Sequence, residues 1–260
     1  MRFATKGIFV STVDKALEVL GLFSERRPSV GLSEAARLLR RDKSTVQRYL
    51  ASLENQGFLE QDALSRAYHL GPAVTRLSVV REITYPIETA VKNVMTKLVQ
   101  DTSETVHLSH LQGVGLSSVG VVETAVRNTR VYIDPSEILP LHLTASGIAY
   151  LAQEPQEKAL KLLQQSFAKT SSVEGVTLES ASALMRFAKT RGYSVADCTF
   201  DYDVVGMAAP VFASSGEPCG AVAVATPKSR FDLETEVRIA TFLVPASHKI
   251  SRIYGAPKDT

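Results

Sequence analysis

The chain has 260 residues, more than a typical single domain, so two domains are expected. Hydrophobic residues make up 45% and charged residues 22%, as in an ordinary globular protein. No apolar run reaches the roughly 18 residues of a membrane span, and the first residues lack the apolar core of a secretion signal. These features favour a cytoplasmic protein without a membrane partner. Cys198 and Cys219 fit no metal or disulfide spacing.

Charge is distributed unevenly along the chain. Residues 1–78 contain 12 Lys and Arg against 8 Asp and Glu, whereas the remainder contains 17 against 19. A basic front segment on a slightly acidic body suits a polyanion-binding head. Many ordinary solvated surfaces carry a similar excess, so the charge alone does not assign a function.

Three helices are predicted at the front of the chain. The first begins at Val13 and ends before the polar run at Ser24. Ser33 is the expected N-cap of the second helix, whose apolar residues recur at helical spacing. The third begins at Lys43 and ends at Gly57, a natural left-handed residue after a helix. Its inward side is predicted to hold Val46, Leu50 and Leu53.

Two short strands, 58–60 and 67–70, follow the third helix and are joined by a polar loop. Three helices and a hairpin in this order indicate a winged helix-turn-helix over residues 1–78. A generic three-helix bundle is the alternative.

Residues 79–100 are predicted to form a helical linker that is kinked at Pro86 and lacks the Gly and Ser of a flexible tether. An apolar stripe runs along it from Ile87 to Leu98. This stripe has too few partners in the small front domain, so we expect it to be buried against a second copy of the chain.

The hydrophobic period changes in residues 101–260. Strands are predicted at 105–111, 116–123, 131–133, 206–212 and 220–225. Helices are predicted at 144–152, 155–167, 178–190 and 233–254. Strands on both sides of a helical block indicate an α+β domain with a largely antiparallel sheet.

Several segments share a likeness to one known family. They are 13–17, 43–48, 54–59, 68–71, 139–147, 192–195 and 208–212. Taken in order, they resemble the IclR family of bacterial transcriptional regulators over nearly the whole chain. The resemblance implies a homodimer or a dimer of dimers that binds double-stranded operator DNA. It also implies a GAF-like effector domain at 101–260, in which helices flank an antiparallel sheet, and control of a catabolic operon, with repression the expected sign.

The outward side of the third helix is the expected DNA-reading surface. Gln47 can pair with an adenine edge, and Arg48 with a guanine edge or a phosphate. Ser44, Thr45 and the free amides of the helix N-terminus suit a phosphate oxygen. Further positive charge is expected from Arg40, Arg41, Lys43 and, at the tip of the wing, Arg66. For each residue, the alternative is an ordinary solvated side chain.

The effector pocket is expected to depart from the family. Relatives that bind small oxo-acids carry an acidic residue, a cysteine and two serines there, and a glutamate is common nearby. The resemblance places these five positions at Ala196, Gly206, Ala223, Ala225 and Thr199. The remaining polar candidates are Thr144, Ser146 and Cys198, and the candidate wall residues are Leu141, Leu143 and Met207.

Small side chains leave volume and remove buried polar groups that an apolar ligand would strand. We therefore expect an effector that is larger and more apolar than glyoxylate or pyruvate, such as a hydroxylated aromatic acid or a related aromatic. The alternative is that these alanines fill the core and no ligand binds.

No nucleophile elbow, phosphate loop, metal spacing or dinucleotide glycine pattern occurs in the sequence, so we assign no catalytic residue, metal or cofactor. His107 and His110 fall on opposite faces of a predicted strand, which makes them a poor metal pair. The stronger alternative to a DNA-binding regulator is a small-molecule sensor that acts without specific DNA binding.

Overall fold

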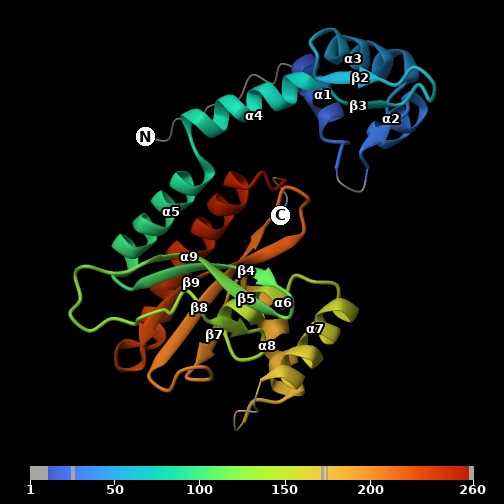
Figure 1. The fold of residues 1–260 in the computed structure, drawn as a ribbon. Coiled ribbons are helices and arrows are strands. Elements are labelled where there is room, and N and C mark those ends of the chain that lie inside the picture. Colours follow the sequence, from blue (N-terminus) through green and yellow to red (C-terminus); the bar gives the residue numbers. More distant parts are fainter. Residues whose placement is uncertain (1–10, 25–26, 171–172, 174, 258–260) are drawn as a thin grey trace, which may run out of the picture. The chain divides into compact units, whose positions relative to one another are not determined.

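The computed structural model describes residues 11–24, 27–170, 173 and 175–257 (Figure 1). The chain divides into two compact units, Met1–Pro86 and Ile87–Thr260. Helices and antiparallel strands occur in both units, which confirms the α+β class predicted from the sequence. The boundary falls inside the predicted linker 79–100, so the two parts of that segment belong to different units.

The first unit combines helices with a small sheet. Its elements are α1 (Ser11–Leu20), β1 (Ser29–Val30), α2 (Leu32–Leu39), α3 (Lys43–Asn55), β2 (Leu59–Gln61), β3 (Tyr68–Leu70) and α4 (Pro72–Thr84). The strands form an antiparallel sheet in the order β1-β3-β2, in which Tyr68 pairs with Val30 on one side and with Gln61 on the other. The hairpin β2–β3 is the wing of a winged helix-turn-helix, which excludes the plain three-helix bundle.

One apolar core joins the helices of the first unit to its wing. Its fully enclosed members include Val19, Val46, Leu50, Leu59 and Tyr68. As predicted, α3 turns Val46, Leu50 and Leu53 inward, and Gly57 follows it with a φ of 72°. Strand β1 was not predicted, because two residues are too few to show a period.

The predicted start of α2 was wrong by a small margin. The helix begins at Leu32, with Gly31 in the N-cap position and no side chain capping it. Ser33 therefore lies inside the first turn and is exposed.

The second unit is built on one six-stranded sheet. Its elements are α5 (Ile87–Thr102), β4 (Thr105–Gln112), β5 (Gly115–Val122), β6 (Ile138–Pro140), α6 (Ala145–Leu151), α7 (Gln156–Lys169), α8 (Leu178–Arg191), β7 (Ser194–Asp197), β8 (Val204–Phe212), β9 (Pro218–Pro227), the short 3-10 helix η1 (Lys228–Arg230) and α9 (Leu233–Ile253). The strand order is β6-β5-β4-β9-β8-β7, and every neighbouring pair is antiparallel.

Helices cover both faces of this sheet (Figure 1). The pair α5 and α9 packs on one face, while α6 packs on the other, with α7 and α8 beyond it. Because side chains alternate along a strand, each strand serves two environments. On β4, Val106 and Leu108 join the core under α5 and α9, whereas His107 lies beside Ser146 of α6.

The apolar stripe of α5 is buried within its own unit. Val91, Val94, Met95 and Leu98 pack with residues of α9, β4, β8 and β9 in a single cluster. The expectation that this stripe needs a second copy was therefore wrong. The sheet and the last helix supply the partners, and of these α9, β8 and β9 come from sequence far from α5, whereas β4 directly follows it.

The segment 131–133 is a loop and not a strand. Val131 is 7% exposed and Tyr132 is 72% exposed, and this alternation resembles that of a strand. The carbonyl of Val131 accepts a hydrogen bond from Thr105 Oγ1 at 2.9 Å, so a side chain anchors the segment where a ladder was expected. The edge strand lies farther along, at β6, where Leu139 pairs with Leu116 of β5.

Candidate DNA-reading surface and ligand cavity

The outward side of α3 is the candidate reading surface of the first unit. Because the opposite side of the helix is buried, Ser44, Gln47 and Arg48 face solvent, and all three are exposed. An amide and a guanidinium on adjacent residues suit hydrogen bonding to base edges in the major groove. The structure therefore gathers these predicted residues on one helix surface, and their role in reading DNA stays a prediction.

Asp42 caps the N-terminus of α3. One of its carboxylate oxygens accepts hydrogen bonds from the Ser44 hydroxyl at 2.7 Å and from the Thr45 amide at 2.8 Å. These bonds, the one from Ser44 first, lower the pKa of Asp42 to about 2. Of the amides at this helix N-terminus, which were expected to be free for a phosphate oxygen, that of Thr45 is therefore already bonded to a carboxylate.

The basic residues around α3 differ in their freedom to bind DNA. Arg40, Lys43 and Arg66 are exposed, and Arg66 sits at the wing tip in a left-handed conformation with a φ of 59°. Arg41 instead pairs with Glu18 of α1, with 2.7 Å between Nη2 and Oε2. This ion pair connects α1 to the turn before α3, so the guanidinium of Arg41 is engaged within the first unit.

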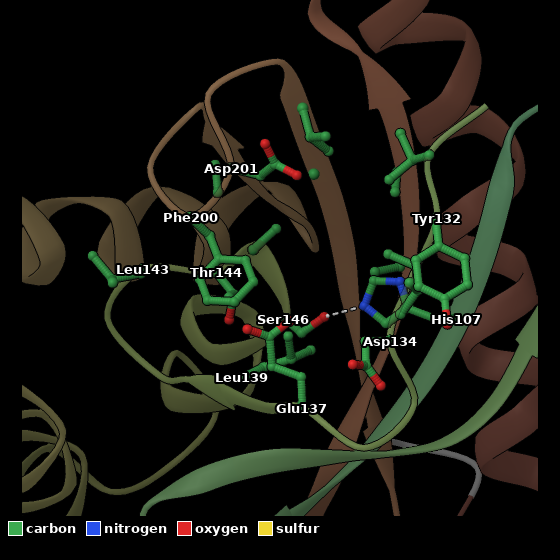
Figure 2. A pocket seen from close by; sticks show the side chains of 18 residues that line it. His107, Tyr132, Asp134, Glu137, Leu139, Leu143, Thr144, Ser146, Phe200 and Asp201 are labelled. Atoms are coloured by element: carbon green, nitrogen blue, oxygen red, sulfur yellow. Dashed lines mark hydrogen bonds between the residues drawn. The ribbon is translucent and has the colours of Figure 1, made fainter. Parts of the chain in front are cut away.

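A cavity of about 110 Å³ lies in the second unit between α6, the sheet and the loop that precedes β6 (Figure 2). Its lining residues are His107, Val131, Tyr132, Ile133, Asp134, Glu137, Leu139, Leu143, Thr144, Ala145, Ser146, Ala196, Phe200, Asp201, Val204, Gly206, Ala223 and Ala225. The strands contribute small residues here, and this is where the volume arises. Cavities of similar size, ~150 Å³, hold a benzene ring.

The structure brings seven of the eleven predicted effector residues into this lining. They are Leu143, Thr144, Ser146, Ala196, Gly206, Ala223 and Ala225. Their meeting follows from strand register, because Ala223 pairs with Ala208 and Ala225 with Gly206, so small residues of β8 and β9 adjoin under α6. Whether they bind an effector stays a prediction.

Four predicted residues lie elsewhere. Met207 points to the other face of the sheet, into the core under α5 and α9. Leu141 is fully buried in the core of α6, α7 and α8. Cys198 follows the end of β7 in a left-handed turn with a φ of 55°, and Thr199 donates a hydrogen bond to the carbonyl of Leu143 at 2.6 Å. Thr199 lines a separate hollow with His142.

Several lining residues were missed from the sequence. The loop before β6 folds back over the sheet and brings Tyr132, Asp134 and Glu137 to the cavity. The spacing of these residues does not predict the course of the loop. Phe200 and Asp201 arrive from the turn between β7 and β8. His107 alternates with the apolar Val106 and Leu108 along β4, which places it on the α6-facing side of the strand with the buried polar Thr105 and Ser109.

Two buried polar groups meet at the floor of the cavity. His107 is 7% exposed and its Nε2 lies 3.3 Å from the Ser146 hydroxyl, while its Nδ1 has no partner among the described residues (Figure 2). Burial lowers the pKa of His107 to about 4, so the ring is neutral at physiological pH. Thr144 is fully engaged, because its hydroxyl accepts from the Gly147 amide and donates to the Pro140 carbonyl.

Within the described part of the chain, no group of three or more His, Cys, Asp or Glu side chains is placed to hold a metal ion. Across the same residues, no helix has both the length and the apolar content that crossing a bilayer requires.

A winged helix-turn-helix with an exposed reading helix, on one chain with a cavity-bearing α+β unit, is typical of a ligand-controlled transcriptional regulator. Two family models match the chain. The model described as "Bacterial transcriptional regulator IclR C-terminal" matches residues 83–252, and the "IclR helix-turn-helix domain" matches residues 12–63. The chain belongs to the IclR family of transcriptional regulators.

Relatives agree with this assignment. The HTH-type transcriptional regulator XynR of Escherichia coli is 28% identical over 260 residues, which cover 95% of this chain and 98% of XynR. The transcriptional repressor IclR of E. coli is 24% identical, covering 95% of this chain and 90% of that one. A solved IclR-type regulator from Silicibacter is 33% identical with a TM-score of 0.70, covering 95% and 96% of the two chains. All three relatives are described as transcriptional regulators or repressors.

Proposed function

We propose that this protein is a repressor of a catabolic operon that reads its operator through the outward side of α3. The observation that carries the proposal is the exposure of Gln47 and Arg48 on a helix whose other side is locked into the core. The fixed inner side determines which side chains can enter the groove. Each bidentate base contact would contribute about 1–3 kcal/mol of discrimination.

The protein acts as a homodimer, or as a dimer of dimers, whose first interface includes α4. Leu77, Val80 and Ile83 recur every three residues along this helix, Val79 lies four residues before Ile83, and each of the four is at least 45% exposed. A second copy of the same helix would cover them, and a two-fold axis suits the paired half-sites that helix-turn-helix dimers bind.

The cavity of the second unit holds the effector, a small ligand that is largely apolar. Its walls are mostly apolar and its volume is close to that needed for one ring. For such a ligand to control transcription, it must bind the DNA-competent and DNA-incompetent dimers with different affinity. A coupling of roughly 1–3 kcal/mol is typical of such regulators.

Binding of the full-length protein to the DNA upstream of its own gene tests the proposal, measured by fluorescence anisotropy against a scrambled duplex of equal length. We expect an affinity at least about a thousandfold higher for the native sequence at physiological salt. Equal, weak binding to both duplexes would favour the alternative of a sensor that acts without specific DNA binding. A reporter fused to the same promoter gives the sign, since deleting a repressor raises expression.

A further inference from the structure

Acidic side chains dominate the charge around the ligand cavity. Asp134, Glu137 and Asp201 are among its lining residues, and none of the described residues that line it is Lys or Arg. Figure 2 shows the carboxylates of Asp134 and Glu137 on one side of the cavity and that of Asp201 on the other. An incoming ligand therefore meets negative charge from opposite sides.

In the described part of the chain, no cationic partner neutralises these carboxylates. Within the described residues, no ion pair joins any of the three to a basic side chain. Hydrogen bonds from Ser136, first from its hydroxyl and then from its amide, lower the pKa of Asp134, which keeps this carboxylate ionised at neutral pH. The charge that borders the cavity is therefore negative.

The floor of the cavity offers neutral hydrogen-bonding groups and no cation. His107 is buried and uncharged, so it presents one ring N–H and one acceptor nitrogen. Among the residues that the structure describes, its buried Nδ1 has no partner and its Nε2 has only the Ser146 hydroxyl within reach. A ligand with both donor and acceptor capacity can satisfy these groups, whereas a carboxylate can only accept.

We propose that the effector is an uncharged or cationic one-ring molecule with a polar substituent on His107 and Ser146, and not a free carboxylic acid. This inference rests on the proposed function, because it takes this cavity to be the effector site. It replaces the aromatic acid expected from the sequence. An anionic ligand would lose its hydration shell beside like charges, whereas a neutral amide, a hydroxyl or an amine keeps favourable contacts at both ends of the cavity.

Three ring compounds of the same shape test the charge preference. Benzoate, benzamide and benzamidinium carry one negative charge, no charge and one positive charge, and calorimetry with the full-length protein at neutral pH compares their affinities. We expect benzamide and benzamidinium to bind at least tenfold more tightly than benzoate. Equal or tighter binding of benzoate, or no binding of any of the three at about ten millimolar, would overturn the proposal.

Substitutions test which side chains cause the preference for uncharged and cationic ligands. The double variant Glu137→Gln and Asp201→Asn should reduce the ratio of benzamide affinity to benzoate affinity at least threefold. The control Glu157→Gln, on the exposed side of α7, should leave this ratio unchanged. His107→Phe keeps a ring but removes both nitrogens, and should lower the affinity for benzamide at least fivefold. Ser146→Ala serves in its place where His107→Phe fails to fold. If the double variant keeps the wild-type ratio of affinities, the carboxylates do not cause the preference.

The outcomes separate this inference from the proposed function. Operator binding is measured without any ligand, so its failure would leave the charge preference of the cavity standing as a property of a sensor. Specific operator binding together with tight benzoate binding would retain the regulator and remove the inference.

Discussion

Glu104 and Arg230 form a two-pronged ion pair inside the second unit, with Arg230 Nε 3.1 Å from Glu104 Oε1 and Nη2 2.8 Å from Oε2. Glu104 is 1% exposed, and the same Nη2 donates to the carbonyl of Thr129 at 3.1 Å. Glu104 follows α5, Arg230 ends η1, and Thr129 lies in the loop between β5 and β6 that carries Tyr132 to the cavity. The pair therefore joins the wall of the cavity to the end of α5.

Glu104→Gln should destabilise the second unit by about 2–4 kcal/mol, because removing the buried carboxylate leaves the partly buried Arg230, and the nearby Arg127, without their anionic partner. Denaturant unfolding followed by circular dichroism measures the change. The control is Glu123→Gln, which breaks the pair with Arg130 on the same loop. Both side chains of that pair are more than a third exposed, so its loss should cost under about 1 kcal/mol. Equal effects of the two variants would contradict the structural role of the buried pair.

The cap on α3 should make the first unit sensitive to acid. The pKa of Asp42 is lowered to about 2 from its ordinary 3.8, so its contribution is complete above about pH 4 and disappears as the pH falls through 2. Asp42→Asn keeps an acceptor oxygen that does not titrate. The thermal midpoint of the wild type should therefore drop relative to that of Asp42→Asn as the pH is lowered from 4 to 2. Parallel curves for the two proteins would show that the carboxylate does not cap the helix.

Because His107 is buried, the stability of the second unit should also depend on pH, in a higher range than that of Asp42. Its pKa is about 4 in the folded protein and 6.5 when unfolded, so the unfolded state binds more protons between these values and stability falls as the pH is lowered. The loss between pH 7 and pH 5 should be about 2 kcal/mol for this residue. His107→Gln should reduce the slope of unfolding free energy against pH. His248→Gln removes an exposed imidazole and should leave the contribution of His107 in place.

The dimer proposal makes a prediction about α4. Val80→Glu with Ile83→Glu places two charges on the exposed apolar side and should halve the mass in solution, measured by light scattering after size-exclusion chromatography. Because these side chains are 52% and 75% exposed, the fold should survive. Leu64→Glu alters a residue that is 95% exposed on the wing loop and should leave the mass unchanged. A wild-type mass in the double variant would place the interface elsewhere.

The local residue pattern predicted most helices and strands, but it did not predict which elements pack against one another. The spacing of Val46, Leu50 and Leu53 predicted both the buried and the exposed side of α3, because the helical period is a property of adjacent residues. The stripe of α5 was also recognised, yet its partner was misassigned because α9 lies more than a hundred residues away. Met207 was placed on the wrong face of its strand, since identity alone does not reveal register.

The cavity shows the same limit. The resemblance to the family placed Ala223, Ala225 and Gly206 in the pocket, and their small size predicted that volume is left there. The acidic residues of the loop before β6 were missed, because a long connection carries no period that would reveal where it folds. Two of the three carboxylates come from that loop, so the sequence led us to expect an aromatic acid or a related aromatic, whereas we now propose a neutral or cationic ligand.

The central claim is that the outward side of α3 reads the operator, and Arg48→Ala tests it most directly. Anisotropy should show a fall of at least tenfold in affinity for the native upstream duplex and a smaller change for a scrambled duplex. Arg37→Ala removes the same charge from an exposed position on α2 and should retain most of the preference. An Arg48→Ala protein with a wild-type circular dichroism spectrum and undiminished affinity for the native duplex would contradict the account.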